Sequence, residues 1–147
     1  MKSEKRILVV DDDDAIRALL TTVLRRRGLR VDTARNGAEA VTRIGECRYS
    51  LILLDLMMPL LSGYQVLEHI AEESAPSRPM VLVLTAGLEP RGFDSTFVIG
   101  TIHKPFDIEM LVDTVVGCLR VTKPLPANTC PPGAVETFSG EQEKETN

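Results

Sequence analysis

The sequence lacks the features of a disulfide scaffold, a zinc protein or a membrane protein. Its three cysteines, Cys47, Cys118 and Cys130, are scattered and odd in number, which fits neither a disulfide framework nor zinc-ligand spacing. No apolar run approaches the ~20 residues that a membrane-spanning helix needs. The charged start of the chain leads directly into an apolar run, unlike a secretory signal peptide. We therefore expect a cytoplasmic protein with free thiols and no membrane partner.

The chain also lacks an excess of basic residues and any internal repeat. Its net charge is −4, whereas a general nucleic-acid binder usually carries a basic surface, so we expect no direct contact with nucleic acid. With 147 residues, 44% of them hydrophobic and 26% charged, the chain is typical of one globular domain with a full core.

Short apolar runs alternate with amphipathic helical patterns along the chain. The central run, residues 51–54, ends abruptly at Asp55, as expected for a strand buried on both faces. Further strands are expected at residues 7–10, 29–34, 80–84 and 101–103, with the alternating 29–34 segment at an edge. Helices are expected at 15–27, 38–44 and 64–73 and after Asp107. This order predicts an α/β fold with a five-stranded parallel sheet and helices on both faces.

Two regions depart from this regular alternation. Between Gly87 and Gly100 the prolines, glycines and β-branched residues make a regular helix doubtful, so the fourth helix is expected to be degenerate. After Arg120 the composition turns proline-rich and then polar and acidic. We expect a domain over residues 1–121 and a disordered tail over 122–147, because the tail has little apolar area to offset its ordering entropy.

Polar side chains follow four of the five predicted strands. They are Asp11 and Asp12, Asp55, Thr85, and Lys104. The carboxyl ends of parallel strands share one edge of the sheet, which is where open α/β sheets bind their ligands. We therefore expect these side chains to converge.

Such a convergence of carboxylates is electrostatically unfavourable unless a cation binds among them. At about 5 Å and an effective dielectric of about 20, each like-charge pair costs roughly 3 kcal/mol. An oxygen-only donor set with no histidine or cysteine nearby suits Mg²⁺. The alternative is a plain acidic strand edge relieved by Lys104 alone. With Mg²⁺ beside it, the Asp55 carboxylate could accept a phosphoryl group as an acyl phosphate, with Thr85 and Lys104 contacting the phosphoryl oxygens.

These motifs resemble those of the receiver domain of two-component response regulators over residues from about 5 to 120. The matching segments are Val10-Asp11-Asp12, Asp55 to Pro59 with Gly63, Leu84-Thr85-Ala86 and Lys104-Pro105-Phe106. The resemblance implies a flavodoxin-like doubly wound sheet of order 2-1-3-4-5 and a Lys104–Pro105 bond that is typically cis.

The same resemblance assigns roles to individual residues. Asp55 is the expected phosphoacceptor, and Thr85 and Lys104 are the expected switch hydroxyl and phosphate-binding lysine. The Mg²⁺ ligands would be Asp55, Asp12 directly, Asp11 largely through water, and Met57 through its backbone carbonyl. A histidine kinase or phosphotransfer protein would be the partner that supplies the phosphoryl group, as part of a phosphorelay, and the downstream partner is unknown.

One departure from the family pattern keeps an alternative open. The aromatic residue usually found three positions before the lysine is replaced by Thr101, on the fifth strand of the family's usual output surface. We expect phosphate chemistry to be retained and signalling through that surface to be altered. The alternative is a degenerate receiver that acts as a phosphorylation-independent docking module.

A turnover enzyme is not expected. A haloacid-dehalogenase-type phosphatase would need a second aspartate two residues after the nucleophile, where this chain has Met57. The residues after the last helix are too few for a DNA-binding or catalytic module, so a stand-alone receiver or a fragment of a longer protein is expected.

Overall fold

The structure, a computed structural model, describes residues 5–58, 61–73, 78–87 and 96–121. Its elements follow in the order β1 (Arg6–Val10), α1 (Asp14–Arg26), β2 (Arg30–Ala34), α2 (Gly37–Glu46), β3 (Leu51–Asp55), α3 (Gly63–Ala71), β4 (Met80–Thr85), β5 (Val98–His103) and α4 (Ile108–Arg120). Every strand pairing is parallel, and the strand order is β2-β1-β3-β4-β5. The predicted fold class and strand order are therefore confirmed.

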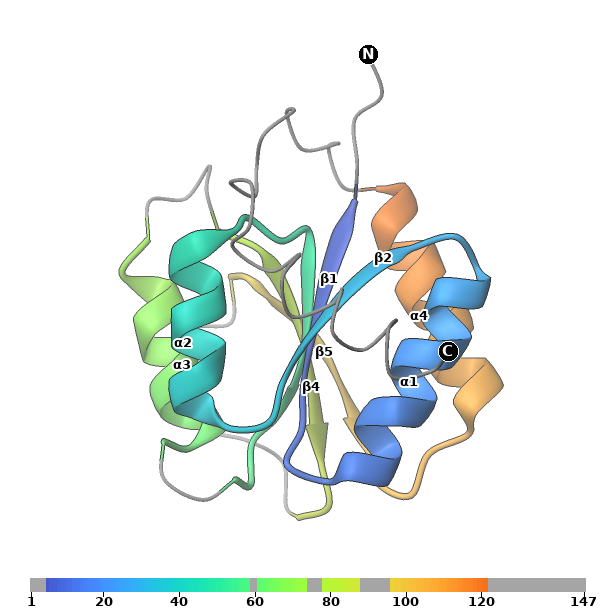
Figure 1. Cartoon of the computed structure of the whole chain (residues 1–147), viewed down its shortest axis with the longest axis horizontal. Helices are drawn as coiled ribbons and strands as arrows, with labels where there is room; N and C mark the ends of the chain where they lie inside the picture. The colour runs from blue at the N-terminus through green and yellow to red at the C-terminus, as the bar shows by residue number, and fades with distance from the viewer. Residues whose placement is uncertain (1–4, 59–60, 74–77, 88–95, 122–147) are drawn as a thin grey trace, which may run out of the picture.

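The sheet separates two hydrophobic cores. Helices α2 and α3 cover one face, and α1 and α4 cover the other (Figure 1). Strands β1 and β3 lie in the middle and are buried along their whole length, because helices cover both of their faces. Their side chains alternate between the cores: Leu8 and Ile52 face α2 and α3, while Ile7 and Leu51 face α1 and α4.

Side-chain caps begin each described helix. Asp13 accepts hydrogen bonds from the first amides of α1, and Asp107 does the same for α4. Ser62 and Gln65 form a reciprocal capping box at the start of α3. These caps satisfy amides that have no partner inside the helix, so each helix starts at a defined residue. Asn36 caps α2 by accepting from the Glu39 amide.

The end of the domain nearest β5 differs from the prediction. Strand β5 begins at Val98, three residues before the predicted start at Thr101, because β-branched residues on both sides of Gly100 allow it to extend. The register of the pairing between β4 and β5 shifts between Val81 and Leu82. This irregularity allows β5 to stay paired with β4 on both sides of it. The predicted degenerate helix falls mostly on residues 88–95, and the predicted tail on 122–147; both lie outside the described residues.

Strand β2 is the predicted edge strand, but one of its polar residues is buried. The Asp32 carboxylate accepts hydrogen bonds from the Arg6 guanidinium at 3.0 Å and from the Tyr49 hydroxyl at 2.9 Å. All three residues are buried. Burial, followed by the charge of Asp32, raises the pKa of the Tyr49 hydroxyl far above its usual value. Tyr49 therefore remains a hydrogen-bond donor that compensates the buried carboxylate.

Two further sequence expectations can be compared with the structure. Cys118 is a free thiol, whereas Cys47 is disulfide-bonded, so the expectation of free thiols is wrong for Cys47. In the described part of the chain, no helix has both the length and the apolar character to cross a membrane.

Candidate functional site: an acidic pocket at the carboxyl edge of the sheet

The predicted acidic residues converge at one edge of the sheet. Asp11 follows the last residue of β1, and Asp55 is the last residue of β3; both side chains are buried. Asp12, the next residue along from Asp11, is exposed. One carboxylate oxygen from each of the three lies within 4.8 Å of the others. The structure thus brings together the three carboxylates that sequence reasoning selected as metal ligands.

Lys104 supplies the positive charge in this pocket. Its ammonium group lies 2.9 Å from Asp11 Oδ2 and 3.3 Å from Asp55 Oδ2. Burial lowers the pKa of Lys104, but the hydrogen bond and charge of Asp11, together with those of Asp55, raise it above its usual value overall. Lys104 is therefore a cation that bridges two strand ends. The predicted cis peptide bond to Pro105 is also present.

Each polar group of Asp11 takes part in a hydrogen bond. Its amide donates to the Ala34 carbonyl at 3.1 Å, and its carbonyl accepts from the Arg17 guanidinium at 2.8 Å. Its Oδ1 accepts from the Asp13 amide at 2.9 Å, and its Oδ2 accepts from Lys104. A carboxylate that is fully enclosed and bonded in this way has little freedom to move.

The environment of Asp55 disfavours its ionised form. Burial, opposed by the Met57 amide at 3.0 Å and reinforced by the charge of Asp11, raises its pKa from 3.8 to about 6. Lys104 offsets only part of this effect. At neutral pH the carboxylate is ionised in an unfavourable site, so a cation bound beside it would relieve the repulsion.

The loop after Asp55 is held close to the end of β3 by tight backbone packing. The Gly63 amide donates to the Leu56 carbonyl at 3.1 Å. A Cβ atom on Gly63 would lie 2.5 Å from Leu56 Cα and 2.6 Å from the Asp55 carbonyl oxygen. Only glycine fits this contact without a backbone shift, which explains the glycine of the matching motif.

Thr85 lies at the same edge of the sheet, at the end of β4. Its hydroxyl oxygen accepts from the Gly87 amide at 3.1 Å, and its carbonyl accepts from the Lys104 amide at 2.8 Å. The described residues contain no hydrogen bond between this hydroxyl and the three carboxylates. The Thr85 backbone is thus bonded to Lys104, the residue that follows β5, while the Thr85 hydroxyl is bonded within its own loop.

The donor set of the pocket fits Mg²⁺. Its three side chains offer carboxylate oxygens only, which are the ligands that this hard cation prefers. The Met57 amide points at Asp55, and the Met57 side chain is exposed. The predicted ligation through the Met57 carbonyl stays a prediction.

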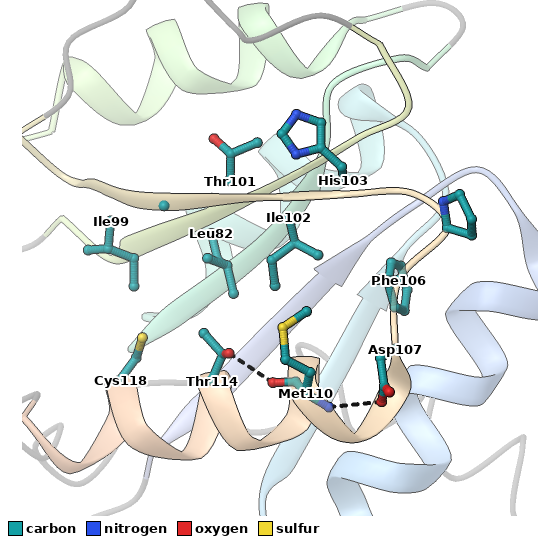
Figure 2. A pocket seen from close by; sticks show the side chains of 12 residues that line it. Leu82, Ile99, Thr101, Ile102, His103, Phe106, Asp107, Met110, Thr114 and Cys118 are labelled. Atoms are coloured by element: carbon teal, nitrogen blue, oxygen red, sulfur yellow. Dashed lines mark hydrogen bonds between the residues drawn. The ribbon is translucent and has the colours of Figure 1, made fainter.

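A groove of about 500 Å³ lies between β5 and α4. Figure 2 shows Leu82 and Ile102 pointing from the sheet toward α4, and Thr101 and His103 pointing away from that helix. The Thr101 side chain, at the sequence position where the family pattern has an aromatic residue, therefore lies on the face of β5 opposite α4.

Arg17 is a residue of this site that sequence reasoning missed. It lies in α1 with a side chain only 18% exposed, and it contacts both the Asp11 carbonyl and the Asp14 carboxylate. An arginine within an amphipathic helix looks like part of a solvated face, and a bond to a backbone carbonyl leaves no trace in the sequence.

Comparison with known proteins agrees with the fold. The sequence model of the response regulator receiver domain matches residues 7–116, so the chain belongs to the receiver domain family of response regulators. The transcriptional regulatory protein ResD of Bacillus subtilis is 41% identical over 121 residues, which is 80% of this chain and 49% of ResD. The chain thus spans about half the length of this curated relative.

Solved structures of response regulators superimpose on this chain and so share its fold. A CheY-like receiver domain protein from Methanospirillum hungatei superimposes with a TM-score of 0.69 at 27% identity, covering 79% of this chain and 97% of the other. The response regulator TrrA from Thermotoga maritima, in complex with Mg²⁺ and BeF, has a TM-score of 0.68 at 35% identity, covering 78% and 98% of the two chains.

Proposed function

We propose that this receiver domain accepts a phosphoryl group on Asp55 in a Mg²⁺-dependent reaction and thereby changes its binding to a partner. The observation that carries the proposal is the pocket itself: the oxygens of Asp11, Asp12 and Asp55 lie within 4.8 Å of one another, and Lys104 bridges two of the three. Such a cluster is costly without a cation and well arranged with one.

Asp55 is the proposed nucleophile. Its Oδ1 is held by the Met57 amide, so the Oδ2 beside Lys104 is the oxygen left to attack phosphorus. The bond from phosphorus to the donor group breaks as the new Asp55 oxygen–phosphorus bond forms, and the donor imidazole leaves. A histidine kinase or a phosphotransfer protein is the proposed donor, as the family and its regulatory relatives suggest.

The remaining pocket residues would stabilise the negative charge on the phosphoryl oxygens. When bound, Mg²⁺ would supply charge neutralisation at the phosphoryl oxygens, and Asp11, Asp12 and Asp55 are the residues that would hold it. Lys104 would move its hydrogen bond from Asp55 Oδ2 to a phosphoryl oxygen. Thr85 would turn its hydroxyl from the Gly87 amide toward another phosphoryl oxygen, and this change would be transmitted to the following loop.

We further propose that the domain is a signalling module rather than a turnover enzyme. Its modification is stoichiometric, and Met57 stands where a phosphatase of the dehalogenase type needs a second acid. We also propose a cytoplasmic location, an unknown downstream protein partner, and no direct nucleic-acid contact by this domain.

A degenerate receiver that never takes phosphate is the second candidate. The replacement of the usual aromatic by Thr101 favours it, because the side chain that reports phosphorylation in the family is absent. The intact pocket weighs against this candidate, since a docking module would have no reason to keep repelling carboxylates.

Beryllofluoride, a mimic of the phosphoryl group, distinguishes the two candidates. The protein is titrated with BeF₃⁻ in the presence of Mg²⁺ and followed by backbone amide chemical shifts. We expect saturable shifts at Asp55, Thr85 and Lys104, and no such response in Asp55→Asn. No response of the wild-type protein at millimolar concentrations would support the docking module.

A further inference from the structure

Arg17 links helix α1 to the proposed metal-binding loop. This loop, residues 11–13, joins the end of β1 to the start of α1. The Arg17 guanidinium donates one hydrogen bond to the Asp11 carbonyl at 2.8 Å and another to the Asp14 carboxylate. Its side chain is 18% exposed although it is charged. A partly buried guanidinium that contacts two groups at once is suited to holding them in a fixed relation.

The contact with the Asp11 carbonyl determines how the next residue is placed. The peptide unit is planar, so the direction of the Asp11 carbonyl sets the direction of the Asp12 amide and Cα. Asp12 is the exposed member of the carboxylate cluster, whereas Asp11 and Asp55 are buried. Burial therefore restrains the Asp12 side chain less than those of Asp11 and Asp55, and Arg17 bonds to the peptide unit that precedes Asp12.

Charge neutralisation by Arg17 is a poor alternative explanation. The guanidinium is paired with Asp14, so it lies within an ion pair outside the pocket rather than among the three carboxylates. A positive charge near a divalent-cation site also weakens cation binding. The two roles thus predict opposite effects: loss of a repelling charge strengthens Mg²⁺ binding, and loss of a positioning contact weakens it.

We propose that Arg17 is a positioning residue for the Mg²⁺ site, and that it acts by fixing the Asp11–Asp12 peptide unit and so directing the Asp12 carboxylate into the pocket. This inference rests on the proposed function, because it requires that the pocket bind Mg²⁺. Arg17→Lys retains the charge but loses the planar guanidinium, whose two terminal nitrogens bond the Asp11 carbonyl and the Asp14 carboxylate separately. Arg17→Gln removes both the charge and the fork of donors.

The test is calorimetric titration of the full chain with Mg²⁺. Outer-shell partners of metal ligands typically change affinity by about tenfold or more, so we expect both variants to bind Mg²⁺ about tenfold more weakly. Arg26→Gln is the matched charge control, because it removes one arginine from the exposed last turn of the same helix. Its Mg²⁺ affinity should equal that of the wild-type protein.

Two further measurements separate positioning from general loosening of α1. Val23→Ala truncates a partly buried apolar residue of the same helix and should leave Mg²⁺ affinity unchanged. In the metal-free protein, Arg17→Gln should speed hydrogen exchange of the Asp13 amide, which donates to Asp11 Oδ1, without affecting the amides of β3.

The outcomes are distinct. Equal or tighter Mg²⁺ binding by Arg17→Gln, an equal loss in Val23→Ala, or unchanged exchange at Asp13 would each overturn the role of Arg17. Failure of the wild-type protein to bind Mg²⁺ at millimolar concentrations would instead overturn the proposed function.

Discussion

Replacement of Asp55 by asparagine should stabilise the metal-free protein. The pKa of Asp55 rises from 3.8 to about 6 on folding, mainly through burial. An acid whose pKa is raised in the folded state destabilises that state when ionised, and the penalty is complete above about pH 6. A shift of this size corresponds to about 3 kcal/mol at pH 7.5, because one pKa unit is worth about 1.4 kcal/mol.

The gain expected for Asp55→Asn is smaller than the full penalty. Asparagine can still accept from the Met57 amide through its carbonyl oxygen, but it loses the attraction of Lys104 at 3.3 Å. We therefore expect the free energy of unfolding to rise by about 1–3 kcal/mol at pH 7.5 without Mg²⁺. The gain should fall to about half at pH 5, because the wild-type carboxyl is then largely protonated in the folded state.

Urea unfolding followed by circular dichroism measures this change, with Asp113→Asn as the control. Asp113 forms an exposed ion pair with Arg27 at 3.6 Å, so its replacement should change stability by less than about 1 kcal/mol. Saturating Mg²⁺ should remove the difference in free energy of unfolding between Asp55→Asn and the wild-type protein. The reason is that only the wild-type protein is stabilised by the full free energy of Mg²⁺ binding. Lower stability of metal-free Asp55→Asn at pH 7.5, or a gain that does not shrink in acid, would refute the reasoning.

Three other expectations follow from the same structure. Mg²⁺ affinity, measured calorimetrically, should fall by about fivefold between pH 6 and pH 5, because the proton on Asp55 competes with the metal; a flat profile would contradict the raised pKa. Asp32→Ala should lower the free energy of unfolding in urea by about 3–5 kcal/mol, because it leaves the Arg6 charge buried without its carboxylate; a loss below about 1 kcal/mol would show that the pair is not desolvated. Gly63→Ala should destabilise by about 1–3 kcal/mol through its clash with the end of β3, whereas Gly117→Ala, at an exposed position of α4 where a Cβ meets nothing within 4 Å, should stabilise slightly; similar thermal unfolding of the two variants would argue against the tight packing at Gly63.

The sheet could be predicted because its strands leave a clear signal. Runs such as residues 7–10 and 51–54 are apolar throughout, as buried parallel strands must be, and each ends at an acidic residue. The start of β5 was missed because Gly100 interrupts its pattern and a register shift allows pairing across it. Local composition cannot reveal a pairing that depends on the neighbouring strand.

The pocket was predictable for a topological reason, whereas its supporting contacts were not. Parallel strands place their carboxyl ends together, so Asp11, Asp55 and Lys104 could be grouped before any coordinates. The contact of Arg17 with a backbone carbonyl has no counterpart in residue patterns. The burial of Asp32 also escaped prediction, because it depends on Arg6, a residue 26 positions away in sequence.

The most direct test of the account is the intact mass of the protein after incubation with acetyl phosphate and Mg²⁺. The account predicts the addition of one phosphoryl group per chain, its loss when Mg²⁺ is chelated before the incubation, and its absence in Asp55→Asn. A wild-type protein that gains no mass, or an adduct that persists in Asp55→Asn, would contradict the central claim that Asp55 accepts the phosphoryl group.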